Sequence, residues 1–328
     1  MRQGSAEHSH SGELSRSGEL SRSGELSHHS PATGTQEQLW YAQIATELTR
    51  PTDRRVADIG CGQAPMAIAL ARALPEATKI LALDSDPDVL ASAAGQIDEA
   101  GLTGQITMIE HDPTDGVEPV RAQLAGADLI WASASLHHVG DQQAVITGLS
   151  SLLAGGGRLA LAEGGLADRH LPWDVGVGEP GLEVRLDAVQ DRWSARMRAE
   201  LAGSVPMPYG WPTAMRLAGL ADITTVSALF EEPTPLAQST REAVLAGFAH
   251  RVDRMASGGF LDDRDRASWD QLLDPADPAW LGHRDDLFSL TVRTLYVGVR
   301  QALRWRSQPL RSPIAGASWD RPASRRAP

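Results

Sequence analysis

Short apolar runs alternate with longer amphipathic stretches through the first half of the chain. The apolar runs predict strands at residues 55–59, 79–83, 105–110, 127–132 and 158–162. The amphipathic stretches predict helices at residues 36–49, 63–74, 87–100 and 141–153. Strands that are apolar on both faces and separated by helices are typical of a parallel sheet covered by helices on both sides.

The pattern is looser after residue 163. It predicts helices at 184–202 and 212–219, strands at 222–229 and 287–299, and helical pieces within 235–275. Gly258-Gly259 and Pro275 interrupt those helical pieces, and more than fifty residues separate the last two predicted strands. A connection of that length is expected to carry structure of its own.

The two ends of the chain differ in composition from the part between them. Residues 11–28 are three Ser-Gly-Glu-Leu-Ser-Arg/His hexapeptides, and one leucine in six residues cannot build a core. Residues 304–328 are rich in Arg, Pro and Ser. We therefore expect disordered tails at residues 1–33 and 304–328.

Composition and charge exclude several classes of function. The net charge is −12 and the tail after residue 300 is basic, so the body of the chain is strongly acidic, which argues against a nucleic-acid partner. The longest apolar run is too short to span a bilayer, and no secretory leader is visible, so we expect a cytoplasmic protein. A single cysteine, Cys61, excludes internal disulfides and cysteine metal clusters. No carboxylate metal site is apparent, and we predict none.

The most informative motif joins the first two predicted strands. The segment Val-Ala-Asp-Ile-Gly-Cys-Gly-Gln-Ala-Pro begins at Val56, and the second strand ends on Asp84, 22 residues after Gly62. Glycines at such a turn let the backbone approach a ligand, and an acid at that distance can hold both hydroxyls of a ribose. The unit therefore predicts a site for a cofactor that carries a nucleoside.

The residue three positions after Gly62 distinguishes between two such cofactors. A dinucleotide fingerprint requires Gly or Ala at position 65, where this chain has Pro65. S-adenosylmethionine (SAM) has no phosphate and does not need that residue. The motif resembles the first motif of the class I SAM-dependent methyltransferases, (V/L)-L-(D/E)-(I/L)-G-C-G-x-G, with Ala64 at the last glycine. The resemblance implies an α/β fold with a Rossmann-like seven-stranded sheet, helices on both faces, and SAM as the cofactor.

The resemblance also implies roles for residues at the carboxyl ends of the strands. Gly60, Cys61 and Gly62 would present backbone to the methionine end of SAM, and Asp84 would accept both ribose hydroxyls. Asp112 would accept from the adenine amino group, as the matching acid does in the family. Asp58 is expected to order the glycine loop and to reach the SAM amino group through water. Ser133, the first residue of the segment that follows strand four, is a further candidate contact with the cofactor.

A second segment narrows the resemblance within the superfamily. Residues 135–139, Ser-Leu-His-His-Val, resemble the segment after strand four in ubiquinone/menaquinone-type and related small-molecule methyltransferases. His137 or His138 is therefore a candidate general base near the methyl acceptor, since histidine exchanges protons near neutral pH. The alternative is that one of them packs against the sheet and bonds backbone.

The sequence thus predicts SAM-dependent methyl transfer to a small-molecule acceptor. Two alternatives remain: an NAD(P)-dependent oxidoreductase with an atypical fingerprint, and a non-catalytic SAM-binding regulator. The acceptor, the methylated atom and homodimer formation stay open. We expect a SAM-binding core at residues 34–165 and the rest of the fold at 166–303. Insertions at about 166–210 and 231–286 would cap the substrate pocket, or else form a packing extension far from it.

Overall fold

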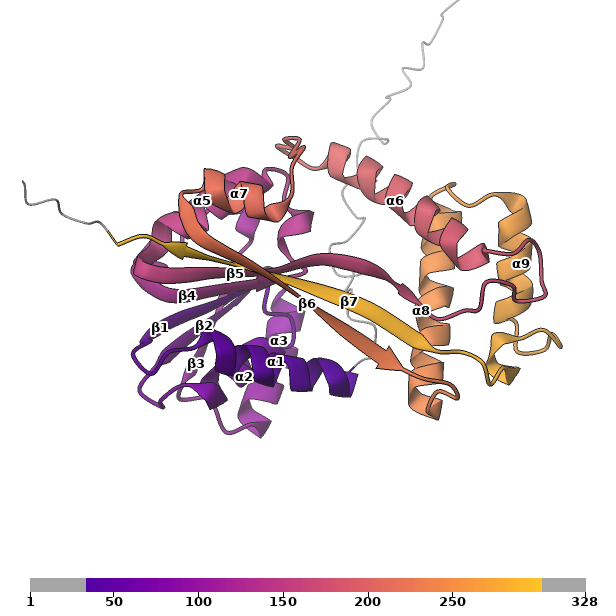
Figure 1. The fold of residues 1–328 in the computed structure, drawn as a ribbon, viewed down its shortest axis with the longest axis horizontal. Helices are drawn as coiled ribbons and strands as arrows, with labels where there is room; N and C mark the ends of the chain where they lie inside the picture. Colours follow the sequence, from indigo (N-terminus) through magenta and orange to yellow (C-terminus); the bar gives the residue numbers. More distant parts are fainter. Residues whose placement is uncertain (1–33, 303–328) are drawn as a thin grey trace, which may run out of the picture.

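The computed structural model describes residues 34–302. The hexapeptide repeat and both predicted tails lie outside the described residues, so their predicted disorder remains a prediction. The described chain forms a twisted sheet with helices on both faces and a group of helices at one end (Figure 1).

Seven strands form one mixed sheet in the order β3-β2-β1-β4-β5-β7-β6. The strands are β1 (Arg55–Ile59), β2 (Lys79–Asp84), β3 (Ile106–Glu110), β4 (Ala127–Ser133), β5 (Leu153–Arg169), β6 (Leu220–Glu232) and β7 (Ser289–Arg300). The first five run parallel, and β7 pairs antiparallel with both β5 and β6. The predicted α/β class and Rossmann-like seven-stranded sheet are confirmed.

Helices cover the sheet on both faces because its central strands are apolar on both. One face carries α1 (Gly34–Leu48), α2 (Pro65–Ala73) and α3 (Pro87–Glu99); the other carries α4 (Arg121–Leu124), α5 (Gln142–Leu152) and α7 (Trp211–Leu217). Successive β4 side chains alternate between them: Trp131 packs with the first group and Ile130 with the second. Both are fully buried, and each such burial contributes about 1.5–3 kcal/mol.

The predicted fifth strand is too short. β5 continues past residue 162 to Arg169, because β7 keeps pairing with it as far as Arg169 opposite Leu290. Its parallel neighbour β4 stops at Ser133, opposite Ala162. The outer part of β5 therefore projects beyond the carboxyl edge of the parallel strands. The sequence does not predict this extension because Glu163-Gly164-Gly165 interrupts the apolar run.

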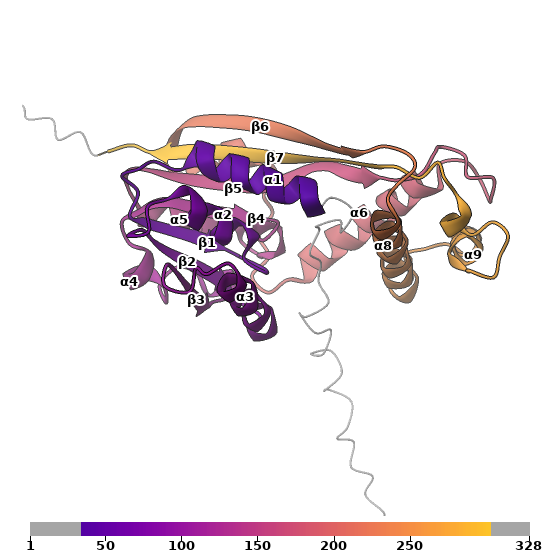
Figure 2. The same ribbon diagram turned by 90° about the horizontal axis from the view of Figure 1, so that it is seen from below.

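The predicted insertions form a helical cluster at the end of this projection. Its elements are α6 (Leu182–Glu200), α8 (Gln238–Ser257), α9 (Asp263–Leu273) and η5 (Leu281–His283). They surround a core of their own, centred on Phe248 and Trp269, and the helical pieces predicted between the last two strands are confirmed. Figure 2 shows these helices beyond the ends of β1 and β4, on the side to which the parallel strands point.

Candidate active site

The glycine loop after β1 has a backbone shape that explains its composition. Gly60 and Gly62 have φ angles of 67° and 53°, in the left-handed region that side chains disfavour. A Cβ on Gly60 would lie 2.4 Å from the Cβ of Ser135, so the two loops touch there. A Cβ on Gly62 would meet nothing within 4 Å. One glycine is thus required by packing, while the other borders open space that a ligand can occupy.

Asp84, the last residue of β2, joins the two strand ends. Its carboxylate accepts the backbone N–H of Gly62 at 2.9 Å and the backbone N–H of Asp86 at 3.1 Å. Asp86 in turn caps α3 by accepting from the N–H groups of Asp88 and Val89. Asp84, the residue predicted to bind the ribose, is therefore fixed at the rim of the glycine loop.

Asp58 occupies the amino end of α2. Its buried carboxylate accepts the N–H of Ala67, the third residue of that helix, at 3.0 Å. The pKa of Asp58 is raised to about 7, mainly by burial; the Ala67 bond opposes this shift and the nearby charge of Asp84 adds to it. A carboxylate thus holds one of the N–H groups that a dinucleotide's phosphates would use.

The Cys61 side chain is buried within the same loop. Burial and the charges of Asp58 and Asp84 raise the pKa of its thiol well above its usual range. The thiol stays protonated at neutral pH, and its contribution to the loop is its backbone, whose N–H donates to Leu83 O at 2.8 Å.

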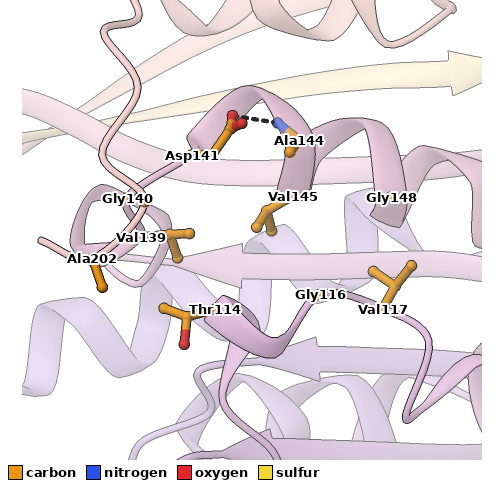
Figure 3. Close-up of a pocket in the computed structure, with 11 residues that line it drawn as sticks. Thr114, Gly116, Val117, Val139, Gly140, Asp141, Ala144, Val145, Gly148 and Ala202 are labelled. Carbon is orange, nitrogen blue, oxygen red and sulfur yellow. Dashed lines mark hydrogen bonds between the residues drawn. The ribbon is translucent and has the colours of Figure 1, made fainter.

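Asp112 lies at the end of β3, where it caps the short helix η3 (Pro113–Asp115). Its carboxylate accepts the N–H and the hydroxyl of Thr114 at 2.8 and 2.7 Å. Thr114 also borders a cavity of about 250 Å³ between η3 and the start of α5, together with Val139 and Asp141 (Figure 3). Neither Asp84 nor the glycine loop lines this cavity, so it is separate from the crevice at the glycine loop.

Ser133 ends β4 and meets α1. The side chain of Tyr41, buried on α1, forms a hydrogen bond with Ser133 and another contact with Glu37 one turn earlier. Burial raises the pKa of Glu37 to about 7, partly offset by Arg293. Trp40 packs on Trp131 and Phe230. Trp40 and Tyr41 both belong to the core, and Tyr41 also links α1 to the end of β4.

His137 and His138 lie on the single-turn helix η4 (Leu136–His138) after β4. The Nδ1 atom of His137 is 3.0 Å from the carboxylate of Glu163, which is almost fully buried. The same carboxylate accepts the N–H groups of Ser135 and Leu136. Burial lowers the pKa of His138 to about 4, and the charges of His137 and Arg198 add to the effect. His138 is therefore neutral at physiological pH.

These strand ends form one surface at the carboxyl edge of the sheet. The Ser135 hydroxyl donates to Ile59 O at 3.2 Å, which places η4 directly against the glycine loop. Acids flank the loop on two sides, through Asp58 and Asp84, and a histidine paired with a carboxylate stands beside it. The arrangement suits a ligand with a ribose and a positive charge.

Comparison with known proteins identifies the domain. A family described as "Methyltransferase domain" matches residues 57–159, from β1 to β5. This part of the chain is a methyltransferase domain of the class I SAM-dependent superfamily. SAM is the methyl donor of that superfamily, so the match supports neither the oxidoreductase nor the regulator alternative.

The individual relatives share about a third or less of their aligned residues with this chain. The chain is 32% identical over 179 residues to trans-aconitate 2-methyltransferase of Afipia carboxidovorans, covering 54% of this chain and 62% of that protein. It is 33% identical over 132 residues to the protein of the same name from Delftia acidovorans, covering 37% and 46%. A solved structure, the YcgJ protein of Bacillus subtilis, aligns with a TM-score of 0.48 at 15% identity, covering 81% and 99%. The chain spans about half the length of the curated relatives.

Two site residues, Glu163 and Glu37, escaped the sequence prediction. Glu163 follows the buried run of β5, so the strand-end argument applied to β1–β4 would also have selected it. Tyr41 and Glu37 are four residues apart on α1, a spacing that places them on one helix face. Within residues 34–302, no group of three His, Cys, Asp or Glu side chains is arranged to hold a metal, and no helix is long and apolar enough to cross a membrane.

Proposed function

We propose that this protein transfers the methyl group of SAM to a small-molecule acceptor, with the cofactor held by the glycine loop, Asp84 and Asp112. The observation that carries the proposal is the occupation of the α2 amino end by Asp58. A dinucleotide would bring two negative phosphates to that place, beside a second acid at Asp84. A sulfonium brings a positive charge there, which these carboxylates attract.

The residues present fit this cofactor. Gly62 borders open space at a left-handed turn, so the methionine end of the cofactor can approach its backbone. Asp84 lies at the rim of the same loop with a carboxylate that can accept two hydroxyls. Asp112, at the neighbouring strand end, is suited to accept from an amino group. The site therefore offers acceptors for the ribose and the base, and backbone for the methionine part.

When bound, SAM supplies a methyl group on a positively charged sulfur, which leaves as a neutral thioether. The protein's own part is to bind and align. Holding donor and acceptor in line can lower a barrier by about 7–11 kcal/mol. We infer that the helices α6, α8 and α9 cover the acceptor and exclude water, because β5 carries them beyond the carboxyl edge of the sheet. This assigns the acceptor site to residues 166–210 and 231–286, beside the cofactor site in residues 34–165.

Calorimetry with the full-length protein tests the proposal. S-adenosylhomocysteine (SAH), the demethylated cofactor, should bind with one-to-one stoichiometry, and NADH and NADPH should give no heat of binding. Binding of a dinucleotide with no binding of SAH would overturn the proposal. The Asp58→Asn variant sharpens the test when binding is measured at about pH 8, above the pKa of Asp58. Removing the negative charge at the α2 amino end should then weaken the binding of SAM more than the binding of the uncharged thioether SAH.

A further inference from the structure

The buried side chains of α6 lie only in its first half. They belong to Leu182, Glu183, Leu186 and Val189, whereas residues 190–200 are all half-buried or exposed. In this second half, the half-buried residues are Gln190, Trp193, Ser194, Met197 and Arg198. Their spacing of three and four positions places them on one face of the helix. Residues 190–200, which we call the strap, therefore turn one face inward without a fully buried side chain.

Hydrogen bonds fix the first half of α6 to the elements around it. The carboxylate of Glu183 accepts the backbone N–H groups of His170 and Leu171, which follow β5, at 3.0 and 3.1 Å. Two nitrogens of Arg185 donate to the carboxylate of Asp265 on α9, each at 2.8 Å. The helix is therefore anchored at its amino end, and the strap extends from that anchor towards the parallel strands (Figures 1 and 2).

Arg198 fixes the other end of the strap. Its guanidinium donates to the backbone oxygens of His137 and Val139, in the histidine segment (residues 135–139). That segment lies directly against the glycine loop. The strap thus joins the helical cluster to the histidine segment, and the Arg198 side chain makes the bonds that hold it there.

An exposed turn connects the strap to the rest of the chain. The N–H of Val205 returns the chain to the core by donating to Gly140 O at 3.1 Å. Before it, Ala202 borders the cavity of about 250 Å³ that Thr114 also lines (Figure 3), and Thr114 is bonded to Asp112. The carboxyl end of the strap therefore lies near the acid proposed to bind adenine. Residues 202–206 are all exposed, so a movement of this turn would break no packed core.

We propose that the strap is a gate over the cofactor crevice and that Arg198 is its latch. Opening breaks the bonds from Arg198 to the histidine segment and uncovers no fully buried side chain of the strap, so the latch carries much of the cost of opening. Bound cofactor would lie against the glycine loop, which the histidine segment contacts, and would hold that segment where Arg198 binds it. Bound cofactor therefore favours the closed gate. The inference rests on the proposed function, which names the ligand.

Thiol labelling of the full-length protein with iodoacetamide tests the gate. Cys61 is buried, so wild type should give only a slow background rate, and a cysteine placed on the strap provides the reactive thiol. Met197→Cys lies on the inner face of the strap, and Ala195→Cys, on its exposed face, is the matched control. Without ligand, Met197→Cys should be labelled more slowly than Ala195→Cys. Saturating SAH should slow Met197→Cys further and leave Ala195→Cys unchanged.

Removing the latch should open the inner face of the strap. Adding Arg198→Met to Met197→Cys should raise the labelling rate about tenfold, the equivalent of one hydrogen bond to a charged group, and should leave Ala195→Cys unchanged. The loss of a nearby positive charge makes a thiol less reactive, so faster labelling would report opening and no change in chemistry.

The outcomes separate the inference from the proposed function. Equal rates for Met197→Cys and Ala195→Cys in the ligand-free protein would overturn the closed gate, and a rate unchanged by Arg198→Met would overturn the latch. A Met197→Cys rate that SAH does not alter, in samples that bind SAH by calorimetry, would overturn the link to the cofactor. Failure of wild type to bind SAH overturns the proposed function instead, while the ligand-free rates still decide whether Arg198 holds the strap.

Discussion

The carboxylate of Asp84 accepts the backbone N–H of Gly62 at 2.9 Å, and this bond ties the end of β2 to the turn after β1. The two residues are 22 positions apart in the chain, yet the parallel pairing of their strands brings them to the same edge. The site is thus assembled by the sheet itself: each strand end contributes one group, and the groups meet because the strands are neighbours.

Replacing Asp84 should weaken the binding of SAH strongly. Hydrogen bonds to a charged group contribute about 1.5–3 kcal/mol, so Asp84→Ala should lower affinity by roughly 10- to 150-fold in calorimetry. Asp88→Ala is the matched control, since it removes an exposed acid on the first turn of α3, and its affinity should equal that of wild type. Equal affinity for the two variants would remove Asp84 from the ribose site.

A methyl group on Gly60 should destabilise the fold. Its Cβ would lie 2.4 Å from Ser135 and its φ of 67° is unfavourable for alanine. We expect Gly60→Ala to lose more than about 2 kcal/mol of unfolding free energy in urea titrations. Gly203→Ala has a nearly identical φ, 68°, with open space around the added carbon. That control should lose only about 1 kcal/mol; equal losses would show that the contact with Ser135 costs nothing.

The same substitution at Gly62 should act on binding instead. The added carbon would meet no protein atom within 4 Å. Gly62→Ala should therefore lose stability only through its left-handed backbone, and it should fold. It would enter the space that we assign to the cofactor, and SAH affinity should fall at least about tenfold, or about 1.4 kcal/mol. Calorimetry that finds wild-type affinity would place the ligand elsewhere.

Stability should fall as pH rises toward neutrality. Burial raises the pKa of Asp58, Glu37 and Glu183 to about 7, whereas their usual values are near 4. Between those limits these three carboxyls bind more protons in the folded chain than in the unfolded chain, so their contribution to the unfolding free energy decreases with increasing pH. The lowered pKa values of His138 and His170 act in the opposite direction, but only below the usual histidine pKa of about 6.5, so the carboxyls dominate up to about pH 7. The melting temperature should therefore be higher at about pH 5.5 than at about pH 8. Asp58→Asn should flatten this difference, and a melting temperature that rises over the same range would contradict the shifts.

The sequence was sufficient for elements with a local signal. β1 and β2 are short apolar runs, the glycine loop needs left-handed backbone, and Asp86-Pro87 begins α3 with a cap and a proline. The outer half of β5 had no such signal, because its pairing with β7 depends on a strand more than a hundred residues later. The bond between Glu163 on β5 and His137 on η4 joins two segments whose meeting depends on the pairing of β4 with β5. Contacts of that kind come from the topology of the sheet.

A crystal structure with SAH bound tests the central claim most directly. We predict that the thioether lies at the carboxyl edge of the sheet, with both ribose hydroxyls on the carboxylate of Asp84 and the homocysteine part against Gly60 and Gly62. SAH bound at another place, with Asp84 still holding only the N–H groups of Gly62 and Asp86, would contradict the account.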